Sequence, residues 1–141
     1  MSFTPGKRGI DEYKQFGKTS GIDEFTPHRL IQMLMEGALE QISMAIGMMQ
    51  RNDIAGKGAC ISKAISIIEG LRTSLDKNAG GDIADNLDAL YEYMASRLLE
   101  GNVHNNEEFL TEVAKLIIEI KSAWDQIPQD IIKQHADNVS E

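Results

Sequence analysis

Three histidines and one cysteine are the side chains here that could hold a metal ion or act in catalysis. His28 and His104 each follow a glutamate by four residues (Glu24 and Glu100), which would place each pair on one face of a helix. Di-iron bundles instead carry Glu-x-x-His motifs in mid-helix, and this sequence contains none. We therefore predict no metal site and no cofactor, with His135 left in a C-terminal tail.

The cysteine and a short glycine motif do not indicate an enzyme. Cys60 stands between Ala59 and Ile61 on an apolar helix face, which is typical of a buried thiol and not of a nucleophile. Gly56-Lys57-Gly58 resembles part of a phosphate-binding loop, but no strand precedes it. The sequence therefore predicts a protein that does not catalyse a reaction.

Charge and composition exclude several kinds of partner. The 141 residues carry a formal net charge of -8, which opposes binding to nucleic acid phosphates and to anionic membranes. No apolar run approaches the length of a membrane span, and the N-terminus does not resemble a secretory signal. A single cysteine excludes an internal disulfide and suits a reducing compartment. We predict a cytoplasmic protein that neither binds nucleic acid nor inserts into a membrane.

Four helix starts and stops can be placed along the chain. Thr26 is a good N-cap and Pro27 suits the first helical position. The run 78–81 ends in two glycines and predicts a break, after which Asp82 caps a third helix. Asn105 and Glu108 have capping-box spacing for the fourth. The predicted helices cover about 27–51, 54–77, 83–100 and 106–126.

These elements predict an all-α fold. Helices of this length joined by short loops favour an antiparallel up-down-up-down four-helix bundle, here residues 26–127. Residues 1–25 contain four glycines and no sustained helical period, so we expect a flexible N-terminal arm. Pro128 ends the last helix, and residues 128–141 form a short C-terminal tail.

The helices carry more apolar surface than one core requires. A bundle helix needs an apolar stripe of about 100°, yet each predicted helix has a second apolar face beside the first. These faces can be wide core stripes, or part of them can form a groove for an amphipathic partner helix. The sequence leaves both interpretations open.

Several runs in these helices resemble the family of flagellar secretion chaperones called FliS. The most specific are Gly80-Gly81-Asp82-Ile83-Ala84 and Leu90-Tyr91-Glu92-Tyr93-Met94, in this order and spacing. Others are Thr26 to Leu34, Lys63 to Ile68, and Tyr13 in the arm. The resemblance covers about residues 13 to 127.

This resemblance implies a cytoplasmic export chaperone. Such a protein binds the disordered C-terminal segment of flagellin, prevents premature polymerisation and supports delivery to the flagellar type III export apparatus. An export-gate component or an anti-sigma factor is a further partner to consider. A bundle that holds a metal or haem is the competing class.

The predicted contacts follow from the resemblance and the apolar faces together. Ile10 and Tyr13 would form an N-terminal lid over the groove. The alternative for each groove residue is simple core packing. The predicted groove residues are Ile61, Ile65, Ile68, Leu71, Leu75, Leu87, Tyr91 and Met94.

Overall fold

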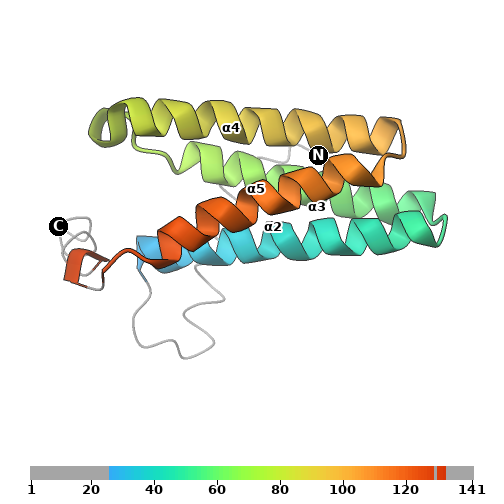
Figure 1. Ribbon diagram of the computed structural model, residues 1–141, viewed down its shortest axis with the longest axis horizontal. Coiled ribbons are helices and arrows are strands. Elements are labelled where there is room, and N and C mark those ends of the chain that lie inside the picture. Colours follow the sequence, from blue (N-terminus) through green and yellow to red (C-terminus); the bar gives the residue numbers. More distant parts are fainter. Residues whose placement is uncertain (1–25, 129, 133–141) are drawn as a thin grey trace, which may run out of the picture.

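A computed structural model describes residues 26–128 and 130–132 (Figure 1). These residues form four long helices and no strand, which confirms the predicted all-α bundle. Ile10, Tyr13 and the rest of the predicted arm lie outside the described residues, as does most of the tail. The helices are α2 (Pro27–Gln50), α3 (Ile54–Thr73), α4 (Lys77–Val103) and α5 (Glu107–Asp125).

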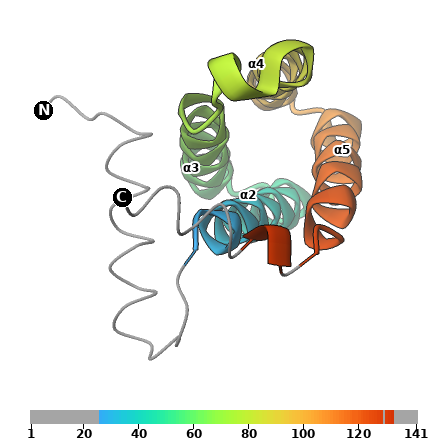
Figure 2. The same ribbon diagram turned by 90° about the vertical axis from the view of Figure 1, so that its left-hand side faces the viewer.

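The four helices follow one another around a ring. Seen from one end of the bundle, α3 lies between α2 and α4, and α5 closes the ring by contacting both α4 and α2 (Figure 2). Only residues 51–53, 74–76 and 104–106 connect successive helices, so each helix runs antiparallel to the one before. All four apolar faces therefore point toward one shared core.

Short polar side chains start the helices by accepting hydrogen bonds from free backbone N–H groups. Thr26 Oγ1 accepts from the Arg29 N–H at 3.0 Å, with Pro27 at the first position, which confirms the predicted start of the first helix. Asp53 Oδ1 accepts from the Gly56 N–H at 2.9 Å and starts α3. These local bonds fix the register in which each apolar face meets the core.

The predicted boundary between the second and third helices is partly wrong. α3 ends at Thr73, and Asp76, not Asp82, caps α4 by accepting from the backbone N–H groups of Asn78 and Ala79. Gly81 then adopts φ 52° and ψ −126° inside α4. These angles are not helical, so the predicted break does occur at this glycine pair. It divides α4 after a first turn that Asp76 already caps, and it is not the end of α3.

The predicted boundary between the third and fourth helices also needs correction. α4 continues past Glu100 to Val103, so Gly101 is inside the helix and buried. Asn105 takes φ 52° in the connecting turn, and Asn106 is the cap that accepts from the Glu108 N–H at 3.0 Å. The predicted capping box at Asn105 therefore does not form. The turn needs one residue with a left-handed backbone, which Asn105 provides, and the next asparagine, Asn106, becomes the N-cap of α5.

The lysine of the Gly56-Lys57-Gly58 motif is a buried cation. Lys57 is the buried charged residue of the described chain, and its Nζ donates to the Asn102 carbonyl and to Asn105 Oδ1, both at 3.1 Å. A positive charge is favourable at the C-terminal end of a helix, here α4. Lys57 thus attaches the α4–α5 connection to the start of α3 and has a structural role.

The core is a single cluster supplied by all four helices. Partly buried apolar side chains on each helix pack against its edges. Its largest fully buried side chains are Leu34, Met35, Ile42, Ile61, Ile68, Leu71, Met94, Leu98, Leu110, Val113 and Ile117.

Candidate partner-binding surface

The structure divides the eight predicted groove residues into two groups. Five are buried and belong to the bundle core: Ile61, Ile68, Leu71, Tyr91 and Met94. Burial alone raises the pKa of the Tyr91 hydroxyl to about 12. The other three, Ile65, Leu75 and Leu87, are half-buried at the edge of the core. In this conformation a partner can reach only these three, and the groove on α3 and α4 stays a prediction.

A second apolar surface lies between α4 and α5. Near their connection the two helices are close, and toward the start of α4 they diverge as α5 descends toward α2 (Figure 1). Ile83 on α4 is 71% exposed, and Leu87, Leu90, Leu116 and Ile120 are half-buried apolar residues of the same two helices. We call this surface the α4–α5 seam; it comprises Ile83, Leu87, Leu90, Leu116 and Ile120.

The C-terminal end of α5 is attached to the start of α2. The rings of His28 and Trp124 stack with centroids 4.9 Å apart. Trp124 Nε1 donates to the His28 carbonyl at 3.0 Å, and His28 Nε2 donates to the Trp124 carbonyl at 2.7 Å. Gln32 Nε2 also donates to Asp125 Oδ1 at 2.7 Å. These contacts draw this end of α5 away from α4.

The first half of α4 is attached to α3 instead. Arg72 Nε donates to Asp88 Oδ1 at 2.8 Å, and Lys77 Nζ lies 3.3 Å from Asp88 Oδ2. The hydrogen bond from Arg72 holds the pKa of Asp88 below its usual value, and Lys77 acts in the same direction. α4 is held by α3 here and α5 by α2, which accounts for the divergence of the two helices (Figure 1).

A cluster of polar and aromatic side chains joins α4 to α5 at the narrow end of the seam. Arg97 Nε donates to Glu112 Oε1 at 2.7 Å, and the Tyr93 hydroxyl donates to Glu112 Oε2. The Arg97 guanidinium also lies 3.6 Å above the centre of the Phe109 ring. Within the described residues, the side-chain hydrogen bonds between these two helices all end on Glu112.

This cluster predicts a pH dependence. Hydrogen bonds from Arg97 and then Tyr93 lower the pKa of Glu112 from its ordinary value of 4.5. A carboxylate with a lowered folded-state pKa stabilises the fold above its unfolded-state pKa and loses this effect as the pH falls through the folded-state value. We expect Glu112→Gln to be less stable than wild type near pH 7 and nearly equal to it in strong acid.

Urea unfolding at neutral pH and in strong acid measures this difference. Glu119→Gln on the same helix is the control, because Glu119 is exposed and has no ion pair within the described chain. An equal deficit for Glu112→Gln at both pH values would show that the cluster does not couple stability to protonation.

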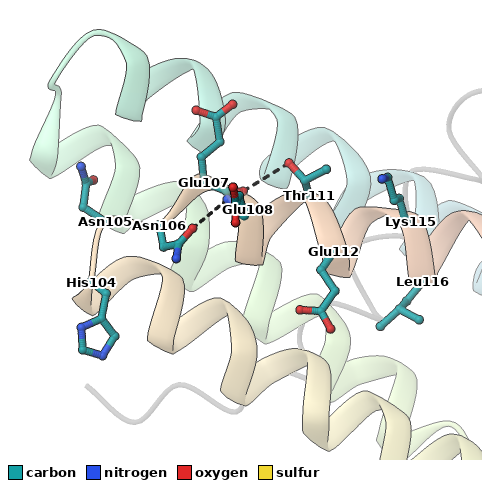
Figure 3. Close-up of a pocket in the computed structure, with 9 residues that line it drawn as sticks. All are labelled: His104, Asn105, Asn106, Glu107, Glu108, Thr111, Glu112, Lys115 and Leu116. Carbon is teal, nitrogen blue, oxygen red and sulfur yellow. Dashed lines mark hydrogen bonds between the residues drawn. The ribbon is translucent and has the colours of Figure 1, made fainter.

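Two pockets lie at the ends of this region. The first, about 950 Å³ and open to solvent, follows the start of α5 (Figure 3). Figure 3 shows Glu112 and Leu116 pointing from α5 toward α4, whereas Glu107 points to the opposite side. The second, about 310 Å³, lies at the far end of the bundle and is mainly apolar. It is lined by Pro27, His28, Leu30, Ile31, Ser74, Trp124, Ile127, Ile131 and Ile132.

The side chains that could do chemistry are dispersed. His28 is in the stack with Trp124, His104 is exposed where α4 ends, and Cys60 is buried. Residues 26–128 and 130–132 contain no group of three or more potential metal ligands, and none of their helices is long and apolar enough to cross a bilayer. His135 lies outside the described residues.

Comparisons with known proteins bear on the family of this chain. Residues 9–131 match the family model described as flagellar protein FliS. A flagellar secretion chaperone FliSB of Pseudomonas aeruginosa is 48% identical over 120 residues, which cover 85% of this chain and 95% of that protein. The chain belongs to the FliS family. FliS of Vibrio cholerae is 41% identical over 86% of this chain and 89% of its own length, and FliS of Bacillus subtilis is 30% identical over 78% and 81%.

Membership in the FliS family confirms the resemblance found in the sequence, but the seam was not among the predicted sites. Of its five residues only Leu87 was predicted as a groove residue. The sequence does place Leu116 and Ile120 on an apolar face of α5. The sequence contains no local signal for the point at which α5 diverges from α4. That point depends on distant contacts, such as the one between His28 and Trp124, which are 96 residues apart.

Proposed function

We propose that this FliS-family chain is a cytoplasmic export chaperone for flagellin. It binds the C-terminal segment of newly made flagellin, prevents premature polymerisation and supports delivery to the flagellar type III export apparatus. The observation that carries the proposal is family membership over most of the chain, with curated relatives named flagellar secretion chaperones.

The physical chemistry of the bundle supports a binding role. A segment that is disordered when free loses conformational entropy on binding, which costs about 2–5 kcal/mol or more of the gross interaction. Apolar contact is the main source of free energy that can offset this loss. The bundle offers such contact at half-buried positions, among them Ile65, Leu75 and Leu87, beside the exposed Ile83. Binding and release by such a surface require no nucleotide.

Titration of the purified chain with cognate flagellin tests the proposal. We expect 1:1 binding of micromolar affinity or tighter, a negative heat-capacity change in calorimetry and a gain of helix in circular dichroism. Flagellin truncated before its C-terminal segment is the control and should not bind. Absence of binding by intact flagellin, or equal binding by the truncated form, would refute this function.

A further inference from the structure

We propose that the first turn of α4, residues 77–80, opens as a unit about Gly81, and that Asp82 then replaces Asp76 as the cap of the helix. This hinged turn goes beyond the proposed function, because it is a second conformation of the bundle itself and needs no partner. It depends on the backbone of Gly81, on two aspartates that can each cap α4, and on the weak attachment of the turn between them.

Gly81 already interrupts α4 in this structure. Its φ of 52° and ψ of −126° lie between two helical parts. Glycine adopts such a backbone conformation readily, whereas residues with a Cβ atom rarely do. A Cβ atom at Gly81 would meet nothing within 4 Å, so packing does not hold the chain at this point. The part of α4 that follows Gly81 can therefore stay helical when the part before it opens.

Two aspartates can each start this helix. Asp76 does so in the structure, where its Oδ1 accepts from the backbone N–H groups of Asn78 at 3.1 Å and Ala79 at 3.0 Å. Asp82 directly follows the glycine pair and is exposed. Aspartate is among the best N-cap residues, and its carboxylate accepts from an N–H two or three positions later. Asp82 can therefore cap a shorter helix that begins at Ile83, which offsets the loss of the cap at Asp76.

The turn between the two caps is weakly attached. Residues 76–79 are exposed, and Ala84, beyond the hinge, is the first buried residue of α4. Lys77 Nζ connects the turn to the rest of α4 by an ion pair of 3.3 Å with Asp88 Oδ2, but the Lys77 side chain is 57% exposed. Ion pairs at such exposed positions contribute little stability. Asp88 keeps its shorter contact with Arg72, at 2.8 Å, when Lys77 leaves, so α4 remains attached to α3.

Opening lengthens the connection between α3 and α4. The connection comprises residues 74–76 in this structure, and it comprises residues 74–81 when Asp82 is the cap. Leu75 lies in this connection and packs half-buried against the core. The second conformation thus changes how one edge of the core is covered, while the helix from Ile83 onward stays in place.

Hydrogen exchange of the full-length chain, measured by NMR, tests the hinged turn. The reporter is the Gly80 amide, which donates to the Asp76 carbonyl at 2.8 Å. Asp76→Ala removes the cap of the closed turn and should speed exchange at Gly80 by about fivefold. Asp82→Ala removes the cap of the open form and should slow this exchange by about the same factor. The control Glu119→Ala removes an exposed acid from α5 and should change the rate by less than about twofold.

Opposite shifts in the two aspartate variants support the hinged turn, because simple fraying of a helix end does not involve Asp82. An unchanged or faster rate at Gly80 in Asp82→Ala overturns it, and so does an unchanged rate in Asp76→Ala. Exchange at Gly80 in wild type as slow as at the core residues Tyr91 and Met94 also overturns it, since the turn would then open only with the whole bundle. Circular dichroism verifies that all three variants remain helical.

Discussion

Ile68→Ala should lower the free energy of unfolding by about 3–4 kcal/mol, because Ile68 is 0% exposed and its removal leaves a cavity in a closed core. Ile65→Ala on the same helix should cost only about 1–2 kcal/mol, since its side chain is half-buried and water can fill part of the space. Helix propensity favours alanine equally in both variants, so it cancels from the comparison.

This pair also tests where the groove ends and the core begins. Both residues were predicted from the sequence to contact a partner, and the structure places only Ile65 at the edge. Chemical denaturation of the two variants beside wild type gives the two free energies. Equal losses would mean that Ile68 is as accessible as Ile65, which would contradict its burial in a closed core.

Gly101→Ala should destabilise the bundle by about 1–3 kcal/mol, although alanine is the better helix former. A Cβ atom at Gly101 would lie 2.5 Å from Leu110 Cδ1 and 3.3 Å from the Asn106 carbonyl oxygen. Leu110 is fully buried and cannot move aside without disturbing its neighbours, so the end of α4 would have to shift away from α5.

Gly58→Ala is the matched control for this substitution. Gly58 is also inside a helix, and a Cβ atom there would meet nothing within 4 Å. It should stabilise the protein by about 0.5–1 kcal/mol, because alanine loses less backbone entropy in a helix. Thermal unfolding should therefore shift in opposite directions for the two variants. A stabilising effect of Gly101→Ala would show that the two helices are not in contact at this point.

The family relation sets these measurements in context. Relatives from Pseudomonas, Vibrio and Bacillus cover more than three quarters of this chain at 30–48% identity. Core and close-approach positions such as Ile68 and Gly101 affect the bundle itself, whereas an exposed residue such as Ile83 contributes little to the core. Stability and flagellin binding should therefore respond to different substitutions, which makes the proposed function testable without unfolding the protein.

The sequence alone determined the helical class, the order of the helices and the family. These properties depend on local patterns, such as Thr26-Pro27 at a helix start or the apolar repeat of α5, which act over a few residues. It was less reliable where two neighbouring signals competed, as for Asp76 against Asp82 and Asn105 against Asn106. There the chosen cap depends on the length of the turn that the packed helices allow.

Only the tertiary structure decided which apolar side chains are buried in the core and which lie at its edge. Ile61 and Ile65 have the same residue type and lie on the same helix, yet one is buried and the other is at the edge. Likewise α4 and α5 diverge where Trp124 contacts His28 on α2 and Asp88 contacts Arg72 on α3. The periodicity of a sequence indicates how apolar one face of a helix is. Whether that face is exposed depends on how distant helices pack against it, which no local pattern predicts.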